Sequence, residues 1–348
     1  MKRACLFFAV VSTSVLLFSC RSYRVIEVET YNPATITFPP EIKTVMIVNN
    51  SAQQPDHVGH RFSSYGKSDS LLSVSADSMA YHFCMSLGKA IAESPLFYDV
   101  RICEDTLRRD SHFYNSRPFT ADEVVSFCND YEVDALIILD KLFFNTVFYE
   151  TDMKNLMMGN GISAKITGEL RTLWPGQKAV YSIPFSDSLV WYMDENFLYE
   201  DVEVFTTSDV RYAIQYLSEW TGRQMHVHFV PFWSDDKRCF YTDISSQWKQ
   251  ATAYAVAGKW AEAAEIWEPM FVRAKKWQPK ARLASNLALC YEMTSNFDKA
   301  VEYAEISDGL FKEFASDSAY VGVQSAYLDI LKKRVTADQI LSEQLREK

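Results

Sequence analysis

Two stretches of sequence decide the fold of the first part of the chain: TVMIV at residues 44–48 and ALIIL at residues 135–139. Both are short, uninterrupted apolar runs with β-branched side chains, which is the pattern of strands buried on both faces of a sheet. Between them, residues 96–102 alternate apolar and polar side chains as a strand does. We therefore predict a β-sheet with buried central strands.

Helical patterns separate these predicted strands. Residues 80–91 carry apolar side chains at helical spacing. Thr120 and Glu123 form the signature of a capping box, in which each side chain satisfies an unpaired backbone N–H at the start of a helix. The order strand–helix–strand–helix–strand predicts a partly parallel sheet with helices packed on it, because right-handed crossovers return the chain to the same sheet.

The sheet is expected to continue with antiparallel strands. Residues 162–172 alternate in polarity, residues 174–177 (WPGQ) supply a turn, and residues 179–191 return as the partner strand. Ser208 then begins a further amphipathic helix. The predicted fold class of residues 42–243 is thus a mixed α/β sandwich of order β-α-β-α-β-β-β-α.

Several parts of the chain resemble known envelope proteins. The element order over residues 42–230 resembles the periplasmic domain shared by the curli-secretion lipoprotein and the lipoprotein activators of penicillin-binding proteins. A second resemblance is carried by residues 44–49 (TVMIVN), 186–191 (SDSLVW) and 230–233 (VPFW), with Arg238 and Tyr241. These are similar to an uncharacterised Bacteroidales lipoprotein family of unknown function, in which such a domain precedes tetratricopeptide-like helices. The resemblance implies a fold and a cellular location, but no mechanism.

The character of the sequence changes at Ser246 to helix-forming Ala, Glu and Lys. Two windows superimpose at a spacing of 37 residues: Ala251, Tyr254, Gly258, Trp260 and Ala263 match Ala288, Tyr291, Ser295, Phe297 and Ala300. Tetratricopeptide repeats use these positions where two helices touch and turn, with a period of about 34 residues. We predict an all-α, tetratricopeptide-like region over residues 244–348; a generic helical bundle is the alternative.

A partner-binding surface follows from this repeat frame. In tetratricopeptide arrays the first helix of each repeat lines a concave groove, and the frame places there Trp248, Thr252, Arg282, Ser285, Leu289 and Glu292, with Val256 and Met293 beside them. A Trp near an Arg and a carboxylate is typical of an interaction hot spot. In the alternative, Trp248 packs against the α/β domain and closes the groove.

The N-terminus predicts export and lipidation. Lys2 and Arg3 precede an uncharged apolar stretch over residues 4–18, which is shorter than the roughly 20 residues of a membrane-spanning helix. It ends in LFSC at residues 17–20, which looks like a lipobox, with Cys20 as the acylated residue. Residues 1–19 are then a signal peptide; an ordinary secretory peptide with an incidental Cys is the alternative.

The residues after Cys20 indicate an address. Residues 20–41 are extended and contain Pro33, Pro39 and Pro40, so we expect a tether between the lipid and the folded body. Residues 21–24 (RSYR) are basic, whereas an acidic run at this place resembles a surface-export tag in Bacteroidetes-type lipoproteins. We therefore expect a membrane lipid anchor on the periplasmic side of the outer membrane.

The charge balance argues against nucleic acid as a partner. The chain has 35 Lys and Arg against 45 Asp and Glu, a net charge of −10 at pH 7. Nucleic-acid binding needs clustered basic side chains, and no basic stripe is visible in the sequence.

Motifs of catalysis and cofactor binding are missing from the sequence. It has no Gly-rich loop with Lys, no HExxH and no GxSxG, so we predict neither an enzyme nor a cofactor. Four histidines, His57, His60, His226 and His228, have spacings that could hold zinc with Asp56 nearby, but loop histidines are usually solvated and we assign no metal. Five cysteines follow Cys20, namely Cys84, Cys103, Cys128, Cys239 and Cys290, without a CxxC pair.

The predicted function is therefore binding. We expect a non-catalytic, membrane-anchored lipoprotein that acts as a protein-binding scaffold or adaptor in the cell envelope. An envelope-assembly component, either part of a secretion apparatus or an activator of a cell-wall enzyme, is the second hypothesis. An unrecognised enzyme is the third, and a buried pair of carboxylates or a His–carboxylate pair lining a pocket would favour it. The loops at residues 49–73 and 150–161 are further candidates for recognition.

The lipid anchor gives the first testable prediction. Cys20→Ser should abolish incorporation of a fatty-acid analogue, because the thiol that receives the lipid is gone, and little mature protein should reach the membrane. The measurement is in-gel detection of the analogue on the purified chain, with Cys103→Ser as the control that keeps the label. Equal labelling of Cys20→Ser and the unchanged sequence would exclude Cys20 as the acylated residue.

Overall fold

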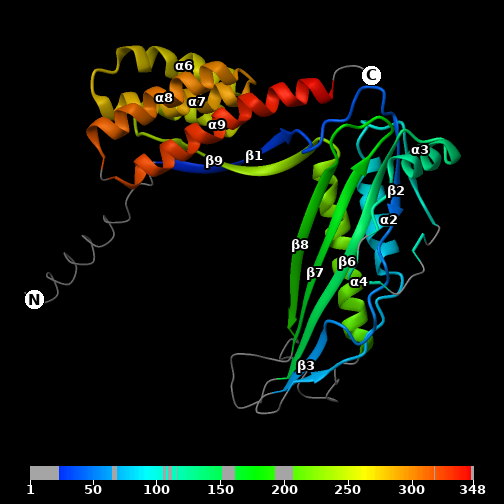
Figure 1. Ribbon diagram of the computed structural model, residues 1–348. Coiled ribbons are helices and arrows are strands. Elements are labelled where there is room, and N and C mark those ends of the chain that lie inside the picture. Colours follow the sequence, from blue (N-terminus) through cyan, green and yellow to red (C-terminus); the bar gives the residue numbers. More distant parts are fainter. Residues whose placement is uncertain are drawn as a thin grey trace, which may run out of the picture. The chain divides into compact units, whose positions relative to one another are not determined.

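The computed structural model describes residues 23–64, 69–104, 107–108, 112–115, 117–150, 161–192, 207–316 and 318–345. The chain divides into two compact units (Figure 1). We call Pro33–Phe232 with Glu343–Lys348 the α/β unit, and Met1–Asn32 with Trp233–Ser342 the helical unit.

The centre of the α/β unit is a parallel trio of strands. β2 (Thr44–Asn49) lies between β5 (Asp99–Ile102) and β6 (Ala135–Glu150). Its Val45 is paired with Val100 on one side and with Ala135 on the other, both in parallel register. The two apolar runs that decide the fold are thus direct neighbours, as expected for strands buried on both faces.

β6 is long enough to organise the rest of the sheet. Along one edge it pairs antiparallel with β7 (Gly161–Leu173), which in turn pairs with β8 (Tyr181–Tyr192). Its second half also pairs in parallel with β3 (His60–Ser64), which continues to the short β4 (Ser70–Leu71). Two strands therefore occupy part of the segment that was expected to be a loop over residues 49–73.

A β-bulge interrupts β6 at Asp140. The register with β7 shifts between Leu139 and Lys141. Before the bulge, Ile137 and Leu139 face the main core; after it, Leu142 faces the same core, so the inward positions change from odd to even numbers. Asp140 itself is only 1% exposed.

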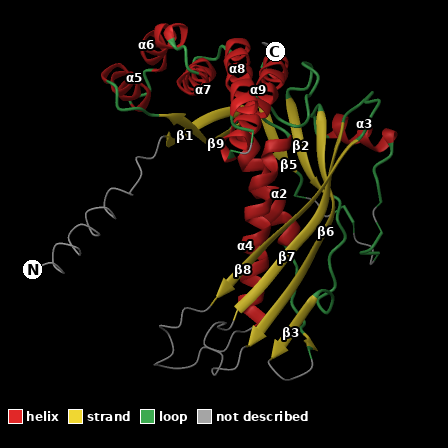
Figure 2. Ribbon diagram, turned by 90° about the vertical axis from the view of Figure 1, so that its left-hand side faces the viewer, coloured by secondary structure: helices red, strands yellow, loops and turns green. Residues whose placement is uncertain are grey.

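Helices cover both faces of this sheet. α2 (Met79–Ala92) and α4 (Thr207–Gln224) lie side by side on one face (Figure 2) and enclose the main core with the odd-numbered residues of β2. A Cβ on Gly222 would lie 2.4 Å from the Phe83 carbonyl oxygen, so the two helices pack backbone to backbone there. α3 (Ala121–Asp130) covers the opposite face.

The predicted capping box at the start of α3 is confirmed. The Thr120 hydroxyl accepts from the Glu123 N–H at 3.2 Å, and the Glu123 carboxylate accepts from the Thr120 N–H at 2.9 Å. Backbone and side-chain hydrogen bonds from Thr120 lower the pKa of Glu123, because both stabilise its charged form.

The helical unit consists of two consecutive helical hairpins and a terminal helix. Its helices are α5 (Ser246–Val256), α6 (Trp260–Arg273), α7 (Trp277–Met293), α8 (Phe297–Phe314) and α9 (Ala319–Gln344). The inter-helix turns contain Gly258 at φ 71° and Ser295 at φ 57°, at equivalent places in the two hairpins. The structure thus confirms the fold class, a mixed α/β region followed by a run of helices. Kinship with tetratricopeptide repeats stays a prediction.

The expected tether over residues 20–41 is partly a strand instead. β1 (Tyr23–Asn32) pairs with β9 (Phe232–Tyr241) in a separate two-stranded sheet, and its Val28 and Thr30 are buried. Prolines begin only at Pro33, and the residues before it alternate inward and outward as a strand requires. The helical unit consequently begins with β1 and resumes at Trp233, whereas we expected its first residue at 244.

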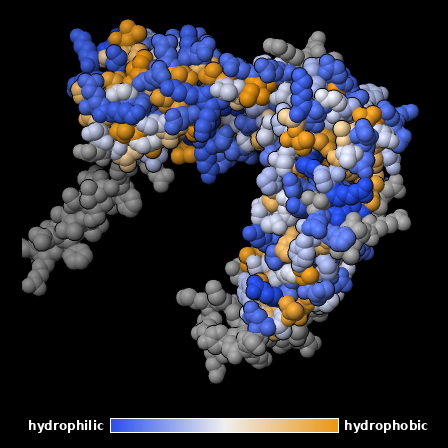
Figure 3. Space-filling view, in the orientation of Figure 1, coloured by the Kyte–Doolittle hydropathy of each residue, from blue (hydrophilic) through white to orange (hydrophobic). Residues whose placement is uncertain are grey.

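The visible surface is mostly hydrophilic. In the view of Figure 3, apolar groups lie in patches among polar ones. Among the described residues, no helix combines the length and the apolar character needed to cross a membrane.

One histidine lies in the core of the α/β unit. His60 is fully buried at the start of β3, where its Nδ1 is 2.8 Å from the Thr146 hydroxyl and its Nε2 has no hydrogen-bond partner. Burial lowers the pKa of His60 below its usual value of 6.5, against a smaller opposing effect of Asp56. The pKa of His228 is also lowered, by burial and by the nearby His226.

Stability should therefore fall on acidification. The unfolded chain binds protons near pH 6.5, while the folded chain resists protonation of His60 to lower pH. The free energy of unfolding is thus undiminished above about pH 6.5 and decreases below it. His60→Gln should reduce this decrease, measured by denaturant unfolding between about pH 7.5 and about pH 5.5. The exposed His57 provides the control: equal slopes for His57→Gln and His60→Gln would refute the assignment.

Candidate functional site

The predicted partner-binding residues lie on the first helices of the two hairpins. Trp248 and Thr252 belong to α5, and Arg282, Ser285, Leu289 and Glu292 belong to α7. Trp248, Ser285, Leu289 and Glu292 are buried, with at most 5% of each residue exposed, and the other two are half-buried. The surface that we expected to be an open groove is therefore closed in this structure.

The end of β9 fills this groove. Asn286 of α7, fully buried, holds the main chain of Tyr241 twice: its side-chain oxygen accepts from the Tyr241 N–H at 2.7 Å, and its side-chain nitrogen donates to the Tyr241 carbonyl at 2.9 Å. The Trp248 indole N–H donates to the same carbonyl at 2.9 Å. These contacts recognise an extended backbone, whatever its side chain.

The Tyr241 side chain is held as well. Its ring stacks on Phe311 at a centroid distance of 6.1 Å, and the Arg282 guanidinium lies 5.5 Å from its centre. Its hydroxyl accepts from the Gln324 side chain at 3.1 Å. Burial raises the pKa of Tyr241, so the phenol stays neutral.

A buried ion pair holds β9 at Arg238, before Tyr241 in the strand. The Arg238 and Glu292 side chains are 4% and 3% exposed, and Arg238 Nη2 lies 2.8 Å from Glu292 Oε1. Arg238 Nε also donates to both carboxylate oxygens, at 3.0 and 3.1 Å. The Tyr327 hydroxyl of α9 donates to Glu292 at 2.8 Å, and burial together with this carboxylate raises the pKa of Tyr327 well above its usual value.

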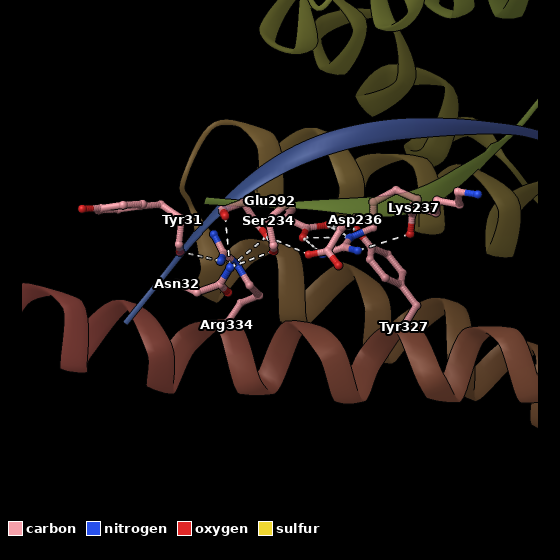
Figure 4. Close-up of polar contacts among 10 residues, drawn as sticks. Tyr31, Asn32, Ser234, Asp236, Lys237, Glu292, Tyr327 and Arg334 are labelled. Atoms are coloured by element: carbon pink, nitrogen blue, oxygen red, sulfur yellow. Dashed lines mark hydrogen bonds and ion pairs between the residues drawn. The ribbon is translucent and has the colours of Figure 1, made fainter. Parts of the chain in front are cut away.

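The same polar network reaches β1 (Figure 4). The Thr30 hydroxyl donates to Asp236 at 2.7 Å, and Asp236 lies 3.6 Å from Arg238. Further along, Asn32 donates to the Ser234 hydroxyl at 2.9 Å and Arg334 of α9 donates to the Tyr31 carbonyl at 2.9 Å. β1 is thus bonded into the helical unit by side chains of β9 and α9.

Trp248 is buried, which agrees with the alternative hypothesis that this side chain packs inside the protein and does not anchor a partner. It packs in the core of the helical unit with Tyr241 and Phe240. In that alternative we expected Trp248 to pack on the α/β domain, but it packs within the helical unit. The expectation differed because our domain boundary at residue 243 assigned β9 to the α/β domain. Sequence reasoning missed Asn286 and Arg238 as site residues. The available signal was the polar Asn286 on an otherwise apolar helix face, because a buried polar side chain needs a hydrogen-bond partner.

Three of the predicted residues keep unused hydrogen-bonding capacity. Thr252 Oγ1, Arg282 Nε and Ser285 Oγ are buried atoms with no hydrogen-bond partner in the described structure. Because a buried polar atom without a partner costs free energy, such atoms usually bond an ordered water, a ligand or a partner chain. β9 therefore occupies the groove without saturating it.

The four histidines considered for zinc do not meet. His60 bonds Thr146, His226 Nδ1 lies 2.7 Å from the Arg223 carbonyl, and His228 Nδ1 lies 2.9 Å from the Thr35 hydroxyl. Within the described ranges, no three His, Cys, Asp or Glu side chains gather as metal ligands would.

The cysteines after Cys20 are buried or half-buried, namely Cys84, Cys103, Cys128, Cys239 and Cys290. Burial raises the pKa of Cys84 to about 12. His82 Nδ1 of α2 lies 2.9 Å from Glu219 Oε1 of α4, with both side chains partly exposed. Cys20 and most of the second candidate loop, residues 151–160, lie outside the described residues.

Comparisons with known proteins give two family matches. A model described as "Domain of unknown function (DUF8603)" matches residues 42–241, and one described as "Domain of unknown function (DUF6340)" matches residues 249–333. No curated protein matches the chain. A crystal structure of an uncharacterized protein is 8% identical and covers 53% of this chain and 97% of its own, but the TM-score of 0.25 is too low to support any argument.

The buried ion pair yields a stability prediction. Arg238→Met should lower the free energy of unfolding of the helical unit by about 3–5 kcal/mol, because it leaves the Glu292 charge buried without a counter-ion. Adding Glu292→Gln should restore part of the loss, since the amide is neutral and still accepts from Tyr327. Denaturant unfolding followed by circular dichroism measures both.

The matched control is an exposed pair. Arg223 and Glu93 are 3.1 Å apart with side chains more than half exposed, so Arg223→Met should cost no more than about 1 kcal/mol. A double variant less stable than Arg238→Met alone would contradict the role given to the unpaired charge.

Proposed function

Because the chain belongs to the family of the domain of unknown function DUF8603, whose description states no activity, we propose its function from its own residues. The protein is a membrane-anchored lipoprotein that acts as a non-catalytic, protein-binding scaffold or adaptor in the cell envelope. Its helical unit is the binding module, and its partner presents an extended segment.

One observation carries this proposal: the groove holds buried polar atoms that β9 leaves unused. Thr252 Oγ1 comes from α5, and Arg282 Nε and Ser285 Oγ come from α7, the two helices that line the groove in the repeat frame. Donors and acceptors at these places suit the main chain of a further polypeptide segment, which offers both kinds of group at every residue.

The way in which the groove holds β9 supports an extended partner. Asn286 and Trp248 bind only main-chain atoms of Tyr241, so this part of the recognition does not depend on sequence. Main-chain bonds supply affinity and neighbouring pockets supply specificity in many peptide-binding modules. The helical unit already shows, on its own strand, the type of contact that we propose for a partner.

The lipid anchor and the cellular location belong to the same proposal. The lipobox-like residues 17–20 and the apolar stretch before them support a lipid on Cys20, and the basic residues after it support the periplasmic side of the outer membrane. The two helical hairpins support the resemblance to a Bacteroidales lipoprotein family with tetratricopeptide-like helices.

The test separates binding from folding. Thr252→Val with Ser285→Ala removes two buried hydroxyls that have no partner, which should leave the free energy of unfolding unchanged or slightly higher. The same change should reduce partner capture several-fold. Capture is measured in intact cells by photo-cross-linking from a reactive residue at Val256, which is 54% exposed at the end of α5.

A hydroxyl with a partner provides the control. Ser307 donates to Gln324 at 3.0 Å in the same unit, so Ser307→Ala should cost roughly 1 kcal/mol of stability and leave the cross-linked species unchanged. Undiminished cross-linking by the Thr252→Val, Ser285→Ala variant, or no discrete cross-linked species from Val256 at all, would count against the proposal.

A further inference from the structure

One end of the helical unit gathers basic side chains that have no carboxylate partner. Residues 273–280 (RAKKWQPK) span the end of α6, the connection and the start of α7, and they contain no acid. The basic cluster consists of Arg273, Lys275, Lys276 and Lys280. The first three are exposed, and none of the four forms an ion pair with a described Asp or Glu. In a chain with a net charge of −10, this cluster is a local exception.

Apolar side chains are exposed beside these charges. Val272, the last residue but one of α6, is 79% exposed, and Phe314 at the end of α8 is 50% exposed. The half-buried ring of Trp277 stacks on Phe314 at a centroid distance of 5.6 Å. Aromatic and aliphatic side chains among Lys and Arg are typical of a surface that contacts lipid headgroups, because such rings favour the boundary between water and hydrocarbon.

The connections at the opposite end of the same helices differ in charge. There α5 is joined to α6 by residues 257–259 (AGK), and α7 is joined to α8 by residues 294–296 (TSN). These two connections contain a single basic residue, Lys259. The basic cluster therefore marks only one of the two ends of the hairpins.

The first strand begins at the end that carries the basic cluster. Asn32 bonds a residue of β9 that precedes the residue bonded by Thr30, so the two strands run antiparallel and the start of β1 lies beside the end of β9. Tyr241, at the end of β9, stacks on Phe311 of α8. Trp277 contacts the same Phe311 ring at a centroid distance of 6.0 Å. The start of β1, the end of β9 and the basic cluster thus lie around one group of rings.

Acidic side chains near the basic cluster are fewer. Asp243 precedes α5 and Glu313 lies in the last turn of α8, and both are exposed. Asp317, in the connection from α8 to α9, lies outside the described residues. Arg24, exposed at the start of β1, adds a further positive charge. Positive charges therefore outnumber negative ones at this end.

A lipid on Cys20 would lie close to this end. β1 starts at Tyr23, three residues after Cys20. An extended chain covers at most about 3.6 Å per residue, so Tyr23 lies no more than roughly 11 Å from Cys20. This distance is comparable to the range over which charges act at physiological salt, about 8 Å. The lipid would consequently hold the basic cluster within electrostatic reach of the membrane surface.

We propose that this end of the helical unit binds the surface of an anionic phospholipid membrane. The basic cluster attracts lipid phosphates, while Val272, Trp277 and Phe314 enter the headgroup layer. Four basic residues are a cluster of the size that attracts such a surface, whereas nucleic-acid binding needs a longer basic stripe. The choice of a membrane as the occupant rests on charge complementarity and on the lipid anchor proposed above.

The experiment places a dye at this end of the full chain. Val272→Cys is labelled with an environment-sensitive dye and added to vesicles of phosphatidylcholine alone, or of phosphatidylcholine and phosphatidylglycerol in equal amounts. The dye emission should shift to the blue on the mixed vesicles and much less on phosphatidylcholine, and added salt should reduce the shift. Val256→Cys carries the dye at the opposite end as the control and should not shift. The unchanged chain, treated with the same dye, gives the background.

A charge variant tests the basic cluster itself. Lys275→Gln with Lys276→Gln removes two exposed charges without breaking an ion pair. It should weaken docking of this end on the mixed vesicles about thirtyfold, roughly fivefold for each charge. Lys259→Gln with Lys333→Gln is the matched control, because it removes two exposed lysines from the opposite end and from the second half of α9. The control should dock as the unchanged chain does.

The outcomes separate this surface from the lipid anchor. No shift of the Val272→Cys dye on the mixed vesicles, an equal shift on both vesicles, or equal effects of the two double variants would overturn the proposal; an unshifted dye would favour an acidic protein as the occupant. Fatty-acid incorporation at Cys20 is measured on the same preparation. A shift without fatty acid removes the anchor and keeps the surface, whereas fatty acid without a shift keeps the anchor and removes the surface.

Discussion

A buried charge must meet an opposite charge and enough hydrogen bonds, and each unit of this protein is arranged around one such pair. In the helical unit, Arg238 reaches from β9 into the groove and finds Glu292, which Tyr327 also bonds. In the α/β unit, Arg171 and Asn50 meet Asp140 at the bulge of β6. Because desolvated charges are strongly destabilising when unpaired, these contacts restrict the register of the strands that carry them. The closed groove of the helical unit follows from that restriction.

Much of the fold could be predicted because its signals are local and periodic. The apolar runs of β2 and β6, the capping box of α3 and the repeated pattern of the two hairpins each lie within a short window of sequence. The bulge at Asp140 could not be predicted in this way. A shift of one residue leaves the apolar run intact and shows only in the pairing with β7, which belongs to another part of the chain.

The sequence predicted the helices that line the candidate groove, but not the strand that fills it. The repeat frame placed Trp248 and Glu292 on one surface, and both do contact the same strand. What fills the groove is decided by contacts between residues far apart in sequence, such as Tyr241 with Asn286 and Thr30 with Asp236. Periodicity within a helix carries no information on such pairs. The prolines of the expected tether also outweighed the alternation in β1, so the strand that completes the unit was missed.

The helical unit is built from two pieces of chain separated by the whole α/β unit. Its first piece, β1, is synthesised long before β9 and the helices against which it must pair. Contacts across such a sequence separation form slowly, because the entropy cost of closing a long loop comes before the contacts contribute any stability. During this interval the hydrogen-bonding edge of β1 is uncovered, and an uncovered edge invites pairing with other chains. A protein assembled in this order is most exposed to wrong pairing early in its folding, while β1 still lacks its partner strand.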